Sequence, residues 1–152
     1  MAIKRGVSFY SYQQAQFFGE MDWKDMCKEL HDNLHCDGVE IINEATVPGY
    51  PFPSKEFIGD WNNTMARYNL QPVAFDGFLD TDFRSLDRPI LDLRDKLDLQ
   101  LAHDMGFKHI RTMTGLPTDV IEGALDTAEK LDVGIAWEIH LPIPIRPNPT
   151  IK

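Results

Sequence analysis

A carboxylate and an imidazole stand two residues apart in the segment VGIAWEIH. Glu138 and His140 follow an apolar run from Val133 to Trp137. Side chains two residues apart on a β-strand point to the same face, so a strand end here would present both groups together. A Glu in this position is a suitable ligand for Mg²⁺ or Mn²⁺. On these residues alone, a Glu that only forms a salt bridge or caps a helix is nearly as well supported.

Polar side chains also end the other apolar segments that we interpret as strands. In an α/β protein, ligands gather at the carboxyl ends of parallel strands, so these residues are candidates for one site. They are Tyr10 and Tyr12, Glu40 with Asn43 and Glu44, Asp76 with Asp80, and Arg111 with Thr112.

Each candidate has a structural alternative. Glu40 interrupts the apolar run GVEII, where a carboxylate is costly unless it is paired. It therefore either pairs with Arg111 inside the protein or serves a substrate. Asp76 either opens a turn with Gly77 or belongs to the site. Arg111 is an ion-pair partner or an anion clamp, and the clamp is favoured. Tyr10 is of a type that is more often a core or rim aromatic than a catalytic group.

The remaining histidines give no case for metal ligation, because they fall on expected helices or on turns between helix and strand. We expect them to face solvent. They are His31, His35, His103 and His109. The two cysteines, Cys27 and Cys36, form neither a disulfide framework nor a spaced metal motif. We expect buried or half-buried thiols in a reducing cytosol.

Hydrophobic periodicity predicts strands that alternate with helices along the whole chain. Asp22 and Ser54 are expected N-caps of the first two helices. Pro89 suits the first turn of the third helix, and Gly106 suits its end. The expected strands are residues 6–12, 37–43, 70–78, 108–114 and 133–140, and the fourth helix runs from Thr118 to Leu131.

This order predicts an α/β fold with a parallel sheet, since nearly continuous apolar strands are typical of sheets covered by helices. Two architectures remain open. Five strands form a complete doubly wound sheet, or they form the first five strands of a barrel that needs roughly 250 residues to close. Periodicity does not decide between the two.

Composition limits the function. The 152 residues are 43% hydrophobic and 26% charged, which is the range of one globular domain. The formal net charge of −9, without a Lys/Arg cluster, disfavours nucleic acid as a partner, including the substrates of DNA-repair enzymes. No apolar run approaches the roughly 18 residues that span a bilayer, and no signal peptide is recognisable. We expect a cytoplasmic protein without a membrane partner.

Five segments, in their order and spacing, resemble the sugar phosphate isomerase/epimerase family of xylose-isomerase-like TIM barrels. Within that family the similarity is closest to the large subunit of bacterial C-glycoside deglycosidases, and it covers nearly all of residues 5 to 142. The segments are GVSFYSYQ, DGVEIINEATVPGYPFPSKEFIGDW, FDGFLDT, IRTMTG and WEIHLP. The resemblance implies a partial (β/α)8 barrel over residues 1–142, followed by a proline-rich extended tail over residues 143–152.

The resemblance also implies a site that depends on a divalent metal, Mn²⁺ or Mg²⁺, with one ligand from each of the last four strands of a complete barrel. Glu138 matches the first of these ligands, and His140 matches a residue near the substrate. Glu40, Asp76 and Arg111 match the polar floor of the site. The departure is that strands six to eight and the other three ligands are not in this sequence. His35 is a smaller departure, because it takes a place where the family usually has a glycine.

We therefore predict His140 and Glu40 as catalytic residues, Tyr10, Asp76 and Arg111 as substrate-binding residues, and Glu138 as a metal ligand. The implied chemistry is proton abstraction next to a carbonyl of a sugar or glycoside, as an isomerase, epimerase or C-glycoside-cleaving lyase. We expect this chain alone to be inactive. The alternative is a non-catalytic fragment or assembly subunit. Either way, an exposed half-barrel predicts a homo-oligomer or a partner subunit.

Overall fold

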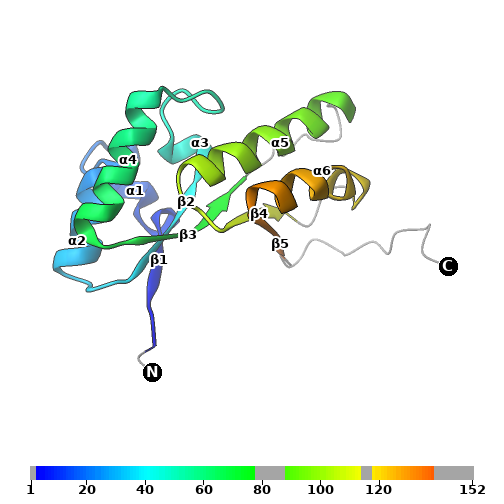
Figure 1. Cartoon of the computed structure of the whole chain (residues 1–152). Helices are drawn as coiled ribbons and strands as arrows, with labels where there is room; N and C mark the ends of the chain where they lie inside the picture. Colours follow the sequence, from blue (N-terminus) through cyan, green and yellow to red (C-terminus); the bar gives the residue numbers. More distant parts are fainter. Residues whose placement is uncertain (1–2, 78–87, 114–117, 139–152) are drawn as a thin grey trace.

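The computed structural model describes residues 3–77, 88–113 and 118–138 (Figure 1). Its five strands are all parallel and lie in their order along the chain, β1-β2-β3-β4-β5. They are β1 (Gly6–Ser8), β2 (Gly38–Ile42), β3 (Gln71–Asp76), β4 (His109–Met113) and β5 (Gly134–Glu138). The predicted alternation of strands and helices is confirmed.

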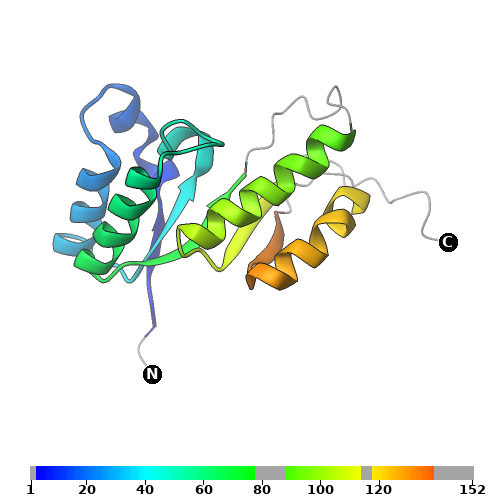
Figure 2. The same ribbon diagram turned by 45° about the horizontal axis from the view of Figure 1, so that its top comes forward.

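Strand order and helix placement decide between the two architectures that the sequence left open. A doubly wound sheet reverses its strand order at one point and carries helices on both faces. Here the order never reverses, and the longer helices lie on the same side of the curved sheet (Figures 1 and 2). These helices are α2 (Trp23–Asp32), α4 (Lys55–Tyr68), α5 (Arg88–Asp104) and α6 (Thr118–Leu131). The partial TIM barrel is therefore the correct prediction.

The helices begin where the sequence places their caps. The Asp22 side chain accepts hydrogen bonds from the backbone N–H groups of Lys24 and Asp25, and the Asp25 carboxylate accepts one from the Asp22 N–H, so α2 starts with a capping box. Ser54 caps α4 by accepting from the Phe57 N–H. Such caps satisfy backbone donors that have no partner inside the helix.

Short elements that the sequence did not predict occupy the carboxyl ends of the first two strands. The expected strand over residues 6–12 ends at Ser8, because the Ser8 hydroxyl accepts from the Tyr10 N–H and starts a 3₁₀ helix, η1 (Phe9–Tyr12). Helix α1 (Gln13–Phe17) follows it, and α3 (Asn43–Thr46) begins directly after β2. The prediction that Tyr10 and Tyr12 end a strand is therefore wrong, since both lie on η1.

The core lies between the outer face of the sheet and the helices. Trp61 is fully buried in α4, donates its ring N–H to the Met105 carbonyl at 3.0 Å, and stacks on Phe107. Cys27 is buried and Cys36 half-buried, as expected, and burial raises the pKa of Cys27 to about 12. No helix in the described ranges has the length and apolar character to cross a membrane.

Left-handed backbone supports two expectations about helix ends. Gly106 has φ +80° where α5 meets the turn into β4. His35 has φ +50°, so it takes the conformation that favours glycine, at a position where histidine tolerates it. The proline-rich tail, residues 143–152, lies outside the described residues.

Candidate active site

The inner face of the sheet, opposite the helices, gathers charged residues from several strands. Alternate residues of each strand point to this face. Across β1 and β2, Ser8 is the register partner of Glu40, and across β3 and β4, Asp76 is the partner of Arg111. Barrel interiors are usually filled by layers of branched apolar side chains. This face is therefore built for polar contacts.

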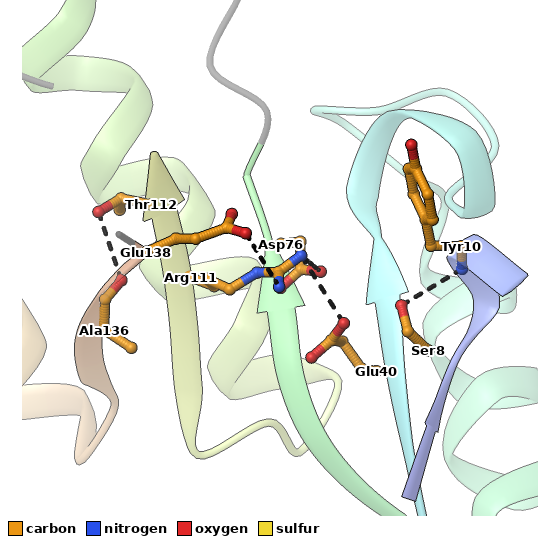
Figure 3. Close-up of polar contacts among 8 residues, drawn as sticks. All are labelled: Ser8, Tyr10, Glu40, Asp76, Arg111, Thr112, Ala136 and Glu138. Atoms are coloured by element: carbon orange, nitrogen blue, oxygen red, sulfur yellow. Dashed lines mark hydrogen bonds and ion pairs between the residues drawn. The ribbon is translucent and has the colours of Figure 1, made fainter. Parts of the chain in front are cut away.

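Arg111 is the centre of an acidic cluster, which we define as Glu40, Asp76 and Glu138 together with Arg111 (Figure 3). Its Nη2 lies 2.6 Å from Asp76 Oδ2 and 3.7 Å from Glu40 Oε1. Its Nη1 lies 3.8 Å from Glu138 Oε1. Four neighbouring strands, β2 to β5, thus supply one cation and three carboxyl groups to one place.

The members of the acidic cluster differ in exposure. The side chains of Glu40 and Glu138 are each 26% exposed and that of Arg111 is 29% exposed, so all three reach solvent. Asp76 is only 2% exposed and lies beneath them. Among the ion pairs of the cluster, the Arg111–Asp76 pair is the short one, and it is also the one that water screens least.

The pKa of Asp76 is raised to about 7, mainly by burial and next by the negative charge of Glu40. The Arg111 guanidinium acts in the opposite direction and lowers it, but it does not offset burial. If all three carboxyl groups were ionised, three negative charges would stand against one arginine, and the cluster would carry a net formal charge of −2. Neutralising one carboxyl group is the ordinary response to such crowding.

The structure places the other predicted site residues apart from the cluster or outside its range. Tyr10 is 54% exposed and points away from Arg111 (Figure 3). It lines a groove of about 780 Å³ on the carboxyl side of β1, together with neutral side chains such as Gln13, Gln14 and Phe17. His140 lies outside the described residues. The structure therefore brings together four of the six predicted site residues.

A second groove, of about 590 Å³, lies between the α1–α2 connection and the loop after α3. None of the predicted site residues lines it. We assign the candidate active site to neither groove, because the charged groups gather on the inner face of the sheet.

Two buried polar residues lie behind the cluster: Asn43, which the sequence already placed at a strand end, and Asp98, which was missed as a functional candidate. Asn43 is fully buried and its Nδ2 has no hydrogen-bond partner. Asp98 on α5 is 4% exposed and accepts a hydrogen bond from the Tyr50 hydroxyl at 2.5 Å. A side chain at Gly77 would place its Cβ 3.4 Å from Asp98 Oδ2 and 3.6 Å from Asn43 Nδ2. Helical spacing was the available signal for Asp98, since it lies on the same face as the buried Leu101 and Ala102.

The described residues do not form a metal centre by themselves. Residues 3–77, 88–113 and 118–138 contain no group of three His, Cys, Asp or Glu side chains that could hold an ion. Glu138 offers one carboxylate, and the Arg111 guanidinium within 4 Å competes with a cation for it. The fit is therefore incomplete: Glu138 suits one ligand position and no more.

Comparisons with known proteins agree with this architecture. No protein-family profile matches the chain. The chain is 26% identical over 146 residues to the "3'-dehydrocarminate deglycosidase alpha subunit" of a Microbacterium species, covering 93% of this chain and 42% of that protein. It is 27% identical over 143 residues to a "C-glycoside deglycosidase alpha subunit" of Arthrobacter globiformis, covering 90% of this chain and 38% of that protein.

Among solved structures, the chain is similar to a sugar phosphate isomerase/epimerase from Parabacteroides distasonis. The TM-score is 0.64 at 14% identity, over 88% of this chain and 50% of that one. At this identity the similarity establishes the fold alone. The chain spans about two fifths of the length of the curated relatives that it matches. It therefore has part of a TIM-barrel fold, and its sequence is similar to those of proteins named alpha subunits of deglycosidases.

Proposed function

We propose that this chain contributes the early strands of a sugar- or glycoside-processing active site that works by proton abstraction next to a carbonyl. The observation that carries the proposal is the acidic cluster, in which Glu40, Asp76 and Glu138 surround Arg111 at the inner face of the sheet. The names of the relatives support the choice of substrate class, because one names a deglycosidase of 3'-dehydrocarminate and the other a deglycosidase of C-glycosides.

In this proposal Glu40 is the base. Its carboxylate is partly exposed on the inner face and is held 3.7 Å from the Arg111 guanidinium, so it remains available to take a proton from a bound sugar. Arg111 faces the same space and would stabilise the negative charge that develops on a substrate oxygen when the proton leaves. Tyr10 lies apart from the cluster, in the groove beside β1, and is proposed to bind the substrate from there. His140 is proposed as a second catalytic residue.

A divalent ion, Mn²⁺ or Mg²⁺, is part of the proposal only through Glu138. When bound, such an ion would polarise substrate oxygens as a Lewis acid. Since the described residues offer one suitable carboxylate, no step assigned here to Glu40 or Arg111 depends on the metal. Isomerisation, epimerisation and cleavage of a C-glycosidic bond all share the proton-abstraction step, and the cluster does not choose among them.

The test is exchange of the substrate proton with solvent. The chain is incubated in D₂O with a 3-keto-C-glycoside and, separately, with free ketoses, with and without Mn²⁺, and exchange is followed by proton NMR. Sequence alone predicts an inactive chain, but the structure brings Glu40 and Arg111 together, so we expect exchange at the carbon next to the carbonyl. Exchange should be lost in Glu40→Gln and retained in Glu122→Gln, a control on the exposed surface of α6. Absence of exchange with every substrate, at any Mn²⁺ concentration, would overturn a catalytic role for this chain.

A second candidate is an assembly subunit without catalytic activity of its own. Two observations favour it: both relatives are named alpha subunits, and no three metal-ligating side chains gather in the described part of the chain. We propose a further subunit or a second copy as its partner. Sedimentation distinguishes the outcomes, since a chain that stays monomeric at every concentration and catalyses exchange would exclude this candidate.

A further inference from the structure

Asp76 is a buried carboxyl group with only half of its hydrogen-bonding capacity used. Its Oδ2 accepts from Arg111 Nη2 at 2.6 Å. Its Oδ1 is buried, and no hydrogen-bond donor reaches it. An ionised carboxylate that is 2% exposed needs donors at both oxygens, because it has given up nearly all of its water. The oxygen that no donor reaches is the one on which a neutral carboxyl group carries its proton.

The groups that face Asp76 add negative charge from several elements. β2 supplies Glu40, β5 supplies Glu138 on the far side of Arg111, and α5 supplies Asp98 beyond Gly77. Arg111 of β4 is the cation that these elements share. The Asn43 amide, buried at the carboxyl end of β2, contributes no charge. One guanidinium therefore stands against several carboxyl groups.

We propose that Asp76 is held as a neutral carboxylic acid, which donates the proton on its Oδ1 to a carboxylate oxygen of Glu40 and so orients Glu40 for its work on the substrate. Asp76 is then a positioning residue, because it lies too deep to touch a substrate itself. The proton stays on Asp76 throughout, and no bond of the substrate is made or broken by it.

Two further facts agree with this assignment. Burial and the charge of Glu40 together raise the pKa of Asp76 to about 7, and a side-chain hydrogen bond with Glu40 acts in the same direction. Glu40 and Asp76 also come from adjacent strands, with Asp76 the register partner of Ile42 on β2. Glu40 and Ile42 share a face, so the two carboxyl groups are directed into the same space.

The role of Glu40 as a base rests on the proposed function, whereas the neutral state of Asp76 does not. The two are therefore tested separately. The first experiment follows the ¹³C-labelled aspartate carboxyl groups of the whole chain by NMR between pH 4 and 9. We expect one aspartate to titrate near pH 7, where the ordinary aspartates have long been ionised.

Three variants assign this titration. Asp76→Asn should remove it, and Glu40→Gln should move its midpoint down by about one pH unit or more, because a neighbouring negative charge is lost. Glu122→Gln, on the exposed face of α6, should leave the midpoint in place. If Asp76→Asn does not fold, the wild-type and Glu40→Gln curves still decide. The inference would be overturned if no aspartate titrated above pH 6. It would also be overturned if Glu40→Gln did not lower the midpoint of the titration.

The second experiment measures the pH profile of the solvent-exchange reaction. We expect the wild-type rate to fall as pH rises past about 7, where Asp76 loses its proton and begins to repel Glu40. Asp76→Asn keeps an N–H donor for Glu40 and a carbonyl for Arg111 and has no proton to lose. Whatever its absolute rate, the rate should therefore not show this fall with pH. A fall that is unchanged in Asp76→Asn would overturn the positioning role. Absence of exchange with the NMR titration intact would refute the proposed function and leave the neutral acid standing.

Discussion

The two faces of the same five-stranded sheet are built from opposite kinds of residue. On the outer face Val39, Ile41, Phe75 and Ile110 are at most 3% exposed and pack against the helices. On the inner face their immediate neighbours in sequence include Glu40, Asp76 and Arg111. A single step along a strand therefore crosses from close-packed core to a cluster of charges.

This difference separates stability from function. Burying apolar side chains on the outer face stabilises the fold by roughly 25 cal/mol per Å². The inner face gives up that contribution and gathers like charges instead, which opposes folding whenever they are all ionised. We infer that packing on the outer face holds the strands in register. The inner face can therefore carry carboxyl groups whose mutual repulsion opposes folding.

The largest effect is expected on the outer face. Phe75→Ala should lower the free energy of unfolding by about 3–5 kcal/mol, because Phe75 is fully buried and packs edge to face on Phe107. Urea denaturation followed by circular dichroism measures this. Val73→Ala on the same strand is the control, since Val73 is 44% exposed and should cost less than about 1 kcal/mol. Equal losses in the two variants would contradict the contrast between the faces.

The next largest effect is expected at the centre of the inner face. Arg111→Met removes the cation that Glu40, Asp76 and Glu138 share, and breaking a buried pair from one side costs about 3 kcal/mol. We expect this loss at pH 8 and a clearly smaller loss at pH 5, where Asp76 already carries its proton.

Denaturation curves at the two pH values, with Lys130→Met on the exposed surface of α6 as a control, measure the difference. An Arg111→Met loss that is the same at both pH values would show that the arginine acts by packing and not by charge.

A smaller effect is expected at the helix that backs the outer face. Asp22→Ala removes the N-cap and half of the capping box of α2, so it should cost about 1 kcal/mol. Asp22→Ser keeps an oxygen acceptor and should recover most of the loss. Thermal unfolding of the three proteins measures both values, and no recovery in the serine variant would refute the cap as the cause.

The smallest effect is expected at Glu138. Its nearest cation atom is 3.8 Å away and its side chain is a quarter exposed, so the ion pair contributes little. Glu138→Gln should change the free energy of unfolding by less than about 0.5 kcal/mol, with a slight gain because one anion is removed. A loss above about 2 kcal/mol would mean that the cluster needs this charge for folding.

The sequence predicted the framework well because the outer face repeats one simple rule. Strands such as GVEII, and the helices capped by Asp22 and Ser54, are predicted from the local spacing of apolar residues. This spacing can be read without knowledge of the tertiary structure. The barrel itself followed from resemblance, since periodicity alone did not separate it from a doubly wound sheet. Sequential strand order then decided the question.

The site was predicted only in part, for physical reasons. Glu40, Asp76, Arg111 and Glu138 were found because charges within apolar strands are unusual and need partners. Sequence left open whether Glu40 pairs with Arg111, and the structure shows that it does. Tyr10 was misplaced because Ser8 ends the strand early through a side-chain hydrogen bond that periodicity does not reveal. The burial of Asp76 depends on tertiary packing, which no local pattern encodes.

The central claim, that the inner face opposes folding when its carboxyl groups are ionised, is tested most directly by the pH dependence of stability. Asp76 binds a proton more tightly in the folded chain, with a pKa of about 7, than in the unfolded chain, near 3.8. Between these values Asp76 holds more protons in the folded state, so its contribution to the free energy of unfolding falls as pH rises from about 4 to 7. The upper limit of this fall is on the order of 4 kcal/mol.

The measurement is the free energy of unfolding of the wild-type chain and of Asp76→Asn, by urea denaturation at half-unit steps from pH 4 to 9. The difference between the two proteins isolates Asp76 from surface carboxylates. We predict that the wild-type chain loses stability relative to Asp76→Asn as pH rises from 4 to 7, and that the difference is then constant. A difference that is flat over this range, or a wild-type chain that gains stability relative to Asp76→Asn, would contradict the account.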